Sequence, residues 1–370
     1  MQIAIDSTSK TPVYVQIYSA LRSKIIGGAF PHGSKLPSKR KLASDCGVSV
    51  ATIEHAYALL CDEDYCETRQ RSGCYVIYSP EYSFPSGDVL HTFGENDTVS
   101  ADTLHFDDIP FSVFSNRMRK VLLDCGEKIL QKSPNNGSHE LREAICRYLS
   151  RSRNIEAAPE QIIIGSGAEY LYGLCIQMLG RENIIALENP SYEKIKAVYN
   201  ANGAVCEMLD MDGEGIKTEA LKNSKASVLH VTPFHSYPSD ITASAARRVE
   251  YINWAKERNA VIIEDDYDSE FILTGVAPET LFSLCPNGNV IYINTFSKTV
   301  APSIRVGYMI LPPSLLPVYS EKIGFYSCTV PMLEQYFLAS WINSGDFERN
   351  INRIRHKIKK IDCNIKKNTV

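Results

Sequence analysis

Asn294-Thr-Phe-Ser-Lys298-Thr-Val-Ala-Pro-Ser-Ile-Arg305-Val-Gly-Tyr-Met-Ile-Leu-Pro312 is the stretch around which the rest of this chain is organised. Apolar runs at 290–293 and 306–311 predict two buried strands joined by a polar loop. A lysine held between buried strands is a candidate to form a Schiff base, because apolar walls favour the free amine. The hydroxyls of Thr295 and Ser297 and the guanidinium of Arg305 are groups that a phosphate monoester beside this amine would need. Since an isolated Ser-Lys pair would more simply be a surface loop, the interpretation depends on motifs upstream.

The composition is that of a globular protein. The chain has 370 residues, 44% of them hydrophobic and 22% charged, with a net charge of −4. This length suffices for two domains, or for one large and one small domain. It has no run of eighteen apolar residues, and residues 1–10 lack the features of a signal peptide. Eleven cysteines, an odd number without a Cys-x-x-Cys pair, indicate neither a zinc site nor a disulfide framework, so we expect a reducing cytoplasm.

The first eighty residues carry the pattern of a winged helix. Apolar spacing over 11–28 predicts a first helix, and Ser38 is placed to cap a short second one. Gly47 supplies a tight turn before a third helix that begins at Ser49, and two helices joined in this way form a helix-turn-helix. Residues 65–69 and 75–78 predict two short strands around a basic tip at 70–73. We therefore expect a winged helix DNA-binding domain over residues 10–78.

Local charge agrees with a DNA-binding head on a separate body. Residues 10–78 contain nine Lys or Arg and six Asp or Glu, a net charge of +3 that leaves about −7 for the rest. On charge alone, a small helical subdomain with an ordinary solvated face would be as good an interpretation.

Three segments carry a family resemblance: Leu36-Pro-Ser-Lys-Arg-Lys-Leu-Ala43, Gly47-Val-Ser49 and Gly73-Cys-Tyr-Val76. Together they resemble the DNA-binding domain of GntR-type bacterial regulators, whose third helix enters the major groove. Val50 stands where that family usually carries arginine. By position, the resemblance implies that the residues facing DNA are Lys39, Arg40, Ser49, Thr52, His55, Arg71 and Gly73.

A segment rich in Pro, Ser and Gly follows, and residues 79–90 are predicted to be a linker. Beyond it, strand-like segments alternate with helix-like ones such as 141–149, 168–179 and 243–258, which predicts an α/β layered domain over 91–370. The expected strands span 161–165, 184–187, 227–231, 261–264 and 290–293.

Polar groups stand at the ends of several of these strands. Residues 164–168, Ile-Gly-Ser-Gly-Ala, open into a helix whose free N–H groups suit a phosphate, and Tyr192 after the next strand offers a flat ring. Residues 263–268, Ile-Glu-Asp-Asp-Tyr-Asp, place four carboxylates around Tyr267, with no histidine near in sequence to favour a metal site. The cofactor that needs such a site is pyridoxal 5′-phosphate. It requires a surface for its ring, an anion site for its phosphate, a carboxylate for its pyridinium nitrogen and a lysine for the Schiff base.

The order and spacing of these motifs resemble the fold-type I aminotransferases over roughly residues 91–370. Combined with the winged helix, the chain resembles the MocR subfamily of GntR regulators. The resemblance implies that Lys298 carries the cofactor, that Asp265 keeps the pyridinium nitrogen protonated, that Tyr267 binds the phenolic oxygen and that Tyr192 stacks on the ring. It also implies a phosphate cradle made of Ser166, Gly167, Ala168, Thr295, Ser297 and Arg305.

Several positions depart from the family pattern. The loop usually written Ser-His-Gln-x-Pro-[ST]-Gly is Phe234-His-Ser-Tyr-Pro-Ser-Asp240 here, and Glu169 stands where relatives often carry glutamine. In relatives, a small C-terminal subdomain with an arginine for a substrate carboxylate follows the position of Val370. We therefore expect this subdomain to be incomplete in the chain, or the effector to bind in another way. A basic segment at 349–360 is more simply a solvated helix face than a DNA contact.

Three functions remain open on the sequence. The first is a homodimeric transcription regulator whose aminotransferase-like domain senses pyridoxal phosphate or its adduct with a small amine or amino acid. The second is a working aminotransferase with an accessory N-terminal domain. The third is a degenerate protein that binds DNA and no cofactor.

Overall fold

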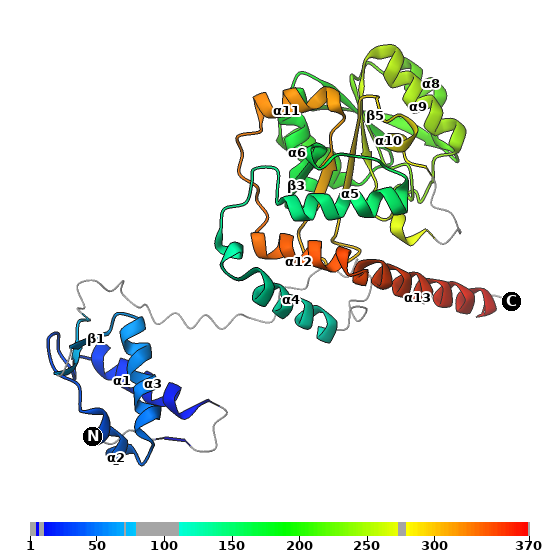
Figure 1. The fold of residues 1–370 in the computed structure, drawn as a ribbon. Coiled ribbons are helices and arrows are strands. Elements are labelled where there is room, and N and C mark those ends of the chain that lie inside the picture. Colours follow the sequence, from blue (N-terminus) through cyan, green and yellow to red (C-terminus); the bar gives the residue numbers. More distant parts are fainter. Residues whose placement is uncertain (1–4, 7–10, 70–71, 79–110, 273–278, 369–370) are drawn as a thin grey trace. The chain divides into compact units, whose positions relative to one another are not determined.

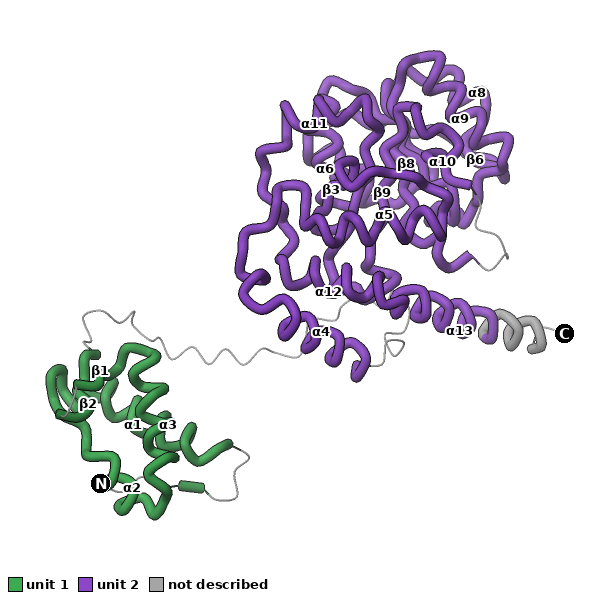
Figure 2. Tube along the Cα trace, in the orientation of Figure 1, with its two compact units in different colours: residues 1–99 green, residues 100–370 purple. Residues whose placement is uncertain are grey.

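In a computed structural model the chain divides into two compact units, residues 1–99 and 100–370 (Figure 2). The structure describes residues 5–6, 11–69, 72–78, 111–272 and 279–368, with side chains up to 360. The predicted linker at 79–90 lies outside these ranges, so the predicted limits of the two domains stay predictions. Among the described residues, no helix is long and apolar enough to cross a membrane.

The described part of unit 1 consists of three helices and a two-stranded antiparallel sheet. They are α1 (Val13–Ile26), α2 (Lys39–Cys46), α3 (Val50–Asp62), β1 (Cys66–Arg69) and β2 (Gly73–Val76). Ser38 caps α2 as expected, accepting a hydrogen bond from the backbone N–H of Lys41. Ser49, expected as the first residue of the third helix, instead caps α3, accepting from the backbone N–H of Thr52. The second strand was predicted two residues too late, because Gly73, taken for the turn, already pairs with Arg69.

Unit 2 is an α/β layered domain around an eight-stranded sheet (Figure 1). The strand order is β3-β10-β9-β8-β7-β4-β5-β6, and the run from β9 to β5 is parallel. The strands are β3 (Ile162–Gly165), β4 (Ile184–Asn189), β5 (Val205–Asp212), β6 (Gly215–Ile216), β7 (Val228–Val231), β8 (Val261–Asp265), β9 (Val290–Thr295) and β10 (Gly307–Ile310). All the strands predicted from apolar runs are present, whereas β5 and β6 lay in segments too polar to be predicted.

Helices cover both faces of this sheet. Successive residues of β9 show the reason, because Tyr292 packs in the core on one face and Ile291 and Ile293 pack in the core on the other. The first core takes side chains from α5 (His139–Arg153), α9 (Ala245–Arg258), α10 (Leu281–Leu284), α12 (Met332–Asn343) and α13 (Asp346–Asn368). The second takes side chains from α6 (Ala168–Leu179), α7 (Glu193–Ala201) and α11 (Leu316–Lys322).

Two further helices reach the first core. α8 (Thr218–Asn223) adds Leu221 to it, and α4 (Phe111–Cys125) packs Phe114 and Met118 against it. The described part of unit 2 also has four short 3-10 turns, of which η3 (Gly126–Leu130) follows α4 and η5 (Ser269–Phe271) follows β8. The predicted helix at 243–258 begins two residues later, because Ser244 caps it through the backbone N–H of Arg247.

Candidate functional site

A cavity of about 670 Å³ opens in unit 2, and this volume suits a small organic ligand. Its walls come from the start of α6, the region around the start of α7, and the segments at the carboxyl ends of β7, β8 and β9. Parallel strands bring their carboxyl ends to one edge of a sheet, where ligands of open α/β folds bind. The lining residues are Ala168, Glu169, Tyr172, Tyr192, Lys194, Ile195, Thr232, Tyr237, Asp265, Tyr267, Thr295, Ser297, Lys298 and Arg305.

Lys298 lies in this cavity with its amine held by two neighbours. Its Nζ donates to Asp268 Oδ2 over 3.3 Å and lies 4.2 Å from the centre of the Tyr267 ring. The sequence predicted apolar walls around this lysine, but 40% of the side chain is exposed and its nearest partners are a carboxylate and an aromatic face. The lysine is therefore placed for reaction with a ligand that enters the cavity.

Asp265 is buried at the end of β8 and lines the cavity. Its Oδ2 accepts a short hydrogen bond from the Tyr172 hydroxyl, and His230 Nε2 lies 3.8 Å away. Burial, partly offset by that hydrogen bond, raises the pKa of Asp265 to about 7. Its Oδ1 is buried and has no hydrogen-bond partner among the described residues. A buried carboxylate that lines a cavity and keeps one unpaired oxygen is suited to a ligand N–H, and above all to a cationic one.

The amino end of α6 forms a second polar wall. Gly167 precedes this helix with φ 92° and ψ 174°, a backbone conformation that is essentially restricted to glycine, and no side chain caps the helix. A Cβ at Gly167 would lie 3.0 Å from Arg305 Nη2, so the absence of a side chain lets the guanidinium approach the helix end. Uncapped N–H groups beside a guanidinium form an anion site.

The predicted phosphate residues do not all line the cavity. Ala168, Thr295, Ser297 and Arg305 do, whereas Ser166 and Gly167 lie just before the helix and outside the lining set. Ser166 Oγ is 3.1 Å from the Thr329 hydroxyl. The Gly-x-Gly pattern thus marked the right helix end, but not which of its residues lie on the cavity wall.

Glu169 is held by cations at this end of the cavity. Its carboxylate oxygens lie 3.6 Å from Arg305 Nη2 and 3.8 Å from Lys194 Nζ. All three side chains are about half exposed, so these pairs are weak and can exchange for a phosphate.

Two tyrosines predicted to contact the ring are present in the cavity. Tyr192 is 41% exposed and meets Tyr237 edge-on, with 5.8 Å between ring centres. The Tyr267 hydroxyl donates to the backbone carbonyl of His235 over 3.0 Å. Burial raises the pKa of this phenol, so the hydroxyl keeps its proton and acts as a donor.

These residues fit pyridoxal phosphate. Lys298 supplies an amine, Asp265 supplies an unpaired oxygen for a protonated ring nitrogen, and the end of α6 with Arg305 supplies an anion site. The sequence missed Tyr172, Lys194, Thr232, Tyr237 and Asp268. Thr232, Tyr237 and Asp268 stood in polar segments at predicted strand ends, whereas Tyr172 and Lys194 lie on helices and reach the cavity through folding.

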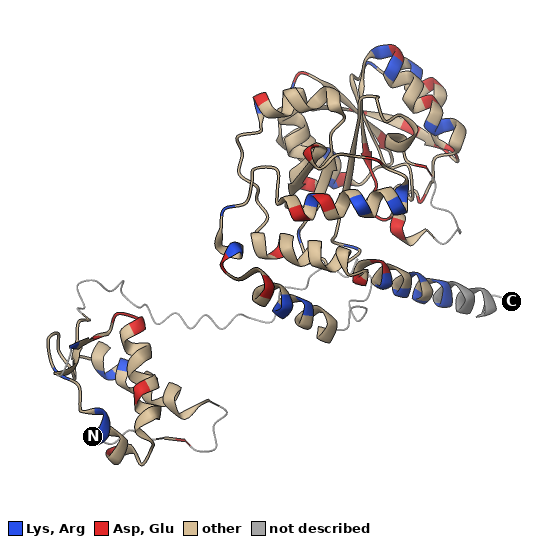
Figure 3. Ribbon diagram, in the orientation of Figure 1, with Lys and Arg blue, Asp and Glu red and all other residues tan. Residues whose placement is uncertain are grey.

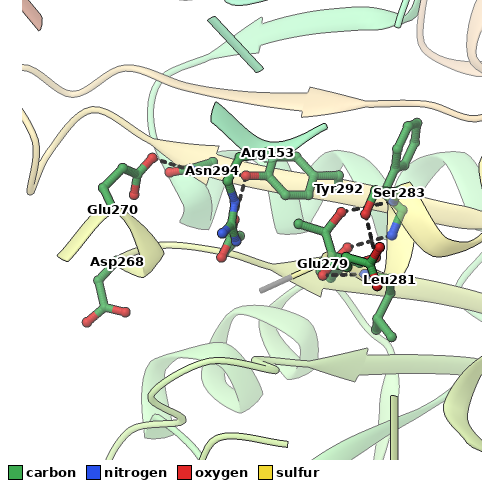
Figure 4. Close-up of polar contacts among 12 residues, drawn as sticks. Arg153, Asp268, Glu270, Glu279, Leu281, Ser283, Tyr292 and Asn294 are labelled. Carbon is green, nitrogen blue, oxygen red and sulfur yellow. Dashed lines mark hydrogen bonds and ion pairs between the residues drawn. The ribbon is translucent and has the colours of Figure 1, made fainter. Parts of the chain in front are cut away.

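A buried polar cluster lies beside the site on β8, β9 and α5 (Figure 4). Arg153 donates to Asp266 Oδ2 over 2.5 Å, and the Tyr292 hydroxyl donates to the same oxygen over 2.6 Å. Asn294 donates to Glu270 over 2.9 Å. Asp266 is next to Asp265 but faces the opposite side of the strand, so the four acidic residues of this motif divide between the cavity and the core.

The predicted DNA-facing residues of unit 1 lie on or beside α2, α3 and the hairpin. Lys39 pairs with Glu54 over 3.1 Å, Ser49 and Thr52 share a 2.8 Å hydrogen bond, and His55 packs edge-on against Tyr14. Arg40 is exposed and Gly73 begins β2, whereas Arg71 lies outside the described residues. The structure thus gives Lys39, Ser49 and Thr52 roles in holding α2 and α3 in place.

Two family models match the chain. "Aminotransferase class I and II" matches residues 111–363, and "Bacterial regulatory proteins, gntR family" matches residues 13–76. The chain is 33% identical over 365 residues to the "Uncharacterized HTH-type transcriptional regulator YdeL" of Bacillus subtilis, covering 96% of this chain and 79% of the relative. It is 27% identical over 375 residues to the "Probable rhizopine catabolism regulatory protein MocR" of Rhizobium meliloti, covering 95% and 76% respectively.

Among solved structures, the chain resembles a kynurenine aminotransferase of Pyrococcus horikoshii crystallised in complex with PMP. The TM-score is 0.61 and the identity 25%, over 67% of this chain and 64% of the enzyme. The chain therefore spans less than two thirds of that enzyme's length.

Proposed function

The chain belongs to the MocR subfamily of GntR-type regulators, and from this premise we propose that it is a DNA-binding transcription regulator that depends on pyridoxal phosphate. Its aminotransferase-like unit senses the cofactor, either alone or joined to an amine. The observation that carries this proposal is the single cavity wall shared by Lys298, the unpaired oxygen of Asp265 and Arg305.

In this proposal, each of the site residues expected from the sequence has one task toward the cofactor. Lys298 attaches to its carbonyl carbon, Asp265 holds the proton on its ring nitrogen, Tyr267 donates to its phenolic oxygen and Tyr192 covers its ring. The phosphate is held by the amino end of α6, the hydroxyls of Thr295 and Ser297, and Arg305. When bound, the cofactor supplies a carbonyl group that captures primary amines and a ring that withdraws electrons.

The effector in this proposal is a small amine or amino acid. Lys194 and Tyr237 line the cavity and are not needed for the cofactor, so they are available to contact it. Binding regulates transcription only if it favours one arrangement of the DNA-binding heads over another, because coupling requires different affinities for two states.

The described part of unit 2 carries apolar side chains that suit a homodimer. Phe111 and Leu123 on α4 and Leu130 on η3 are 78%, 77% and 82% exposed, and Phe325 before α12 is 67% exposed. Large exposed apolar side chains gathered on one segment mark interaction surfaces. Two copies joined in this way carry two heads, as a two-fold DNA site requires. Because its target is bacterial DNA, we place the protein in the cytoplasm.

A working aminotransferase is the second candidate function, and the cavity itself favours it. Lys298 and Asp265 both line the cavity, which brings together the amine and the carboxylate that a reacting site needs. Steady transfer of amino groups from a panel of amines to a keto acid would establish this activity.

The cofactor proposal is tested by the colour and the chemistry of the purified chain. We expect a yellow protein, and borohydride reduction should fix the cofactor on Lys298, as read by mass spectrometry of the peptide. Lys298→Ala should stay colourless and unlabelled. A colourless wild-type chain that added pyridoxal phosphate does not change would support the degenerate protein instead.

The DNA proposal is tested on the DNA upstream of the protein's own gene. Binding should weaken steeply with added salt, because basic side chains displace counterions from phosphates. Arg40→Ala with Arg71→Ala should abolish it, whereas Lys225→Ala, an exposed lysine of unit 2, should leave it unchanged. Equal binding by all three proteins would exclude this DNA-binding face.

A further inference from the structure

Three ionisable side chains lie in a line that begins at the cavity, in the order Lys298, Asp268 and His235. Lys298 Nζ is 3.3 Å from Asp268 Oδ2, and the other oxygen of this carboxylate is 3.7 Å from His235 Nδ1. The side chain of Asp268 is 14% exposed and that of His235 is 35% exposed. Figure 4 shows Asp268 apart from the buried Arg153–Tyr292 cluster, with its carboxylate pointing away from it.

The backbone holds this line in place. The carbonyl of His235 accepts the hydrogen bond of Tyr267, whose ring lies under the Lys298 amine. His235 has φ 49°, a left-handed conformation that L residues adopt only occasionally. His235 is therefore anchored to the tyrosine that supports Lys298, and the three groups keep their spacing.

This line of side chains provides a way to remove the proton that Lys298 must lose before it reacts. An amine attacks a carbonyl only as the free base, so the amine of a charged lysine must first lose one proton. The proton needs an acceptor close to the amine, and Asp268 Oδ2 is 3.3 Å from Nζ. His235 beside Asp268 is a further acceptor, because imidazole exchanges protons near neutral pH.

We propose that Asp268 and His235 form a proton-transfer pair that takes the proton from Lys298 when this lysine captures a carbonyl group. The inference rests on the proposed function of Lys298. One proton passes from Nζ through Asp268 to Nδ1 of a neutral His235, and Nε2 then releases a proton to solvent. The freed electron pair of Nζ bonds the carbonyl carbon, and the carbonyl oxygen leaves as water with the two protons that remained on the nitrogen.

The charges around the line give the direction of its pH dependence. His235 faces Asp268, Asp240 and Lys298, and the Asp268 carboxylate beside its Nδ1, partly offset by burial, raises the pKa of His235 above that of a free histidine. Lys298 also faces Asp265 across the cavity. Because only neutral His235 can accept the proton, carbonyl capture should speed up as pH rises through the titration of His235.

The experiment follows the capture of pyridoxal phosphate by the full-length cofactor-free chain. Absorbance gives the rate across the neutral range, and borohydride reduction with mass spectrometry confirms attachment at Lys298. We expect a rate step with pH in the wild type. His235→Asn and Asp268→Asn should lose this step and react slower, on the order of 100-fold. An unchanged pH profile in His235→Asn would overturn the inference.

His235→Asn separates proton transfer from structure. Asparagine tolerates the left-handed backbone and offers Asp268 a hydrogen-bond donor, but it does not titrate. Asp240→Asn is the matched control, because it removes an equal charge that faces His235 outside the line, and it should keep the step.

A second measurement needs no cofactor. The pKa of His235, followed by NMR of the imidazole, should fall in Asp268→Asn, and an unchanged value would also overturn the inference. If the wild-type chain forms no reducible adduct at all, the proposed function fails and this inference fails with it. If the chain forms the adduct at a rate that His235→Asn does not change, only the inference fails.

Discussion

Gly167 shows how one backbone conformation shapes the anion-binding end of the cavity. Its φ of 92° with ψ of 174° leaves the end of α6 open, and the missing Cβ leaves room for Arg305. Both features serve the same purpose, because the helix N–H groups and the guanidinium must reach one phosphate. A glycine is therefore required twice over at this position.

We predict that Gly167→Ala destabilises unit 2 by about 1–3 kcal/mol, the cost of forcing a side chain into this backbone region. It should also weaken binding of pyridoxal phosphate, because the new methyl group would displace Arg305. Denaturant unfolding and a cofactor titration measure the two effects. Gly213→Ala is the matched control, since its Cβ would meet nothing within 4 Å. Equal losses in both variants would contradict the special role of Gly167.

Glu188 is a buried acid whose ionisation opposes folding. It accepts from the Ser236 hydroxyl and the Thr232 backbone N–H, and burial raises its pKa from 4.5 to about 8 in spite of these bonds. The folded chain therefore binds more protons than the unfolded chain between these two pH values. Stability from this residue is largest at the acid end and falls as pH rises towards about 8.

Glu188→Gln removes this dependence because an amide accepts the same bonds without ionising. Relative to wild type, we expect the variant to gain roughly 1–3 kcal/mol of unfolding free energy at the alkaline end of that range. Near pH 4.5 the two proteins should differ little. Denaturant unfolding of the cofactor-free chain at both ends is the measurement, with exposed Glu219→Gln as the control. A constant difference across the range would show that Glu188 is ionised throughout.

At the scale of the element, α3 combines a structural cap with a surface meant for DNA. Ser49 accepts from the backbone N–H of Thr52 over 3.1 Å, and its hydroxyl also lies 2.8 Å from that of Thr52. The sequence placed both residues against DNA. Because the two hydroxyls are hydrogen-bonded to each other, any DNA contact that they make must involve groups that also stabilise the first turn of α3.

Two substitutions at Ser49 separate these tasks. Ser49→Ala should cost about 1 kcal/mol of winged-helix stability through loss of the cap. Ser49→Asp keeps a capping oxygen and should retain stability, but its charge should repel DNA phosphates and weaken binding. Thermal unfolding and DNA titration at one salt concentration give the two readings. Normal DNA affinity in Ser49→Asp would place the end of α3 away from the phosphates.

The last helix, α13, is basic, but unlike α3 it is not expected to contact DNA. Lys and Arg residues recur along its described part (Figure 3), while Phe347, Ile351 and Ile354 are buried against the body of unit 2. This is the pattern of an amphipathic helix with one solvated face. The structure therefore agrees with the simpler interpretation of the basic segment at 349–360.

At the scale of the whole molecule, the exposed apolar residues of α4 and η3 predict association. Leu123 and Leu130 contribute little to folding because they are 77% and 82% exposed. Leu123→Asp with Leu130→Asp should convert a dimer into a folded monomer, because burying two carboxylates in an interface is costly. Light scattering gives the mass and circular dichroism the fold. Val249→Asp, at a position 48% exposed on α9, is the control. A double variant that stays dimeric would show that the interface does not include these residues. A monomeric wild-type chain would contradict the proposed dimer.

The sequence by itself determined the two kinds of unit, most strands and the identity of the cofactor. Apolar runs, the caps at Ser38 and Ser49, and the spacing of Lys298 from Arg305 are local patterns, and local patterns can be found in a sequence. The family resemblance singled out Asp265 among the carboxylates at 264–268, but only the tertiary structure placed Asp266 in the buried cluster with Arg153. It also brought Tyr172, Lys194 and Thr232 to the cavity and joined His235, Asp268 and Lys298 in one line. The physical reason is that these residues lie far apart along the chain. The order of the parallel strands brings the carboxyl ends of those strands, and the segments that follow them, to one edge of the sheet.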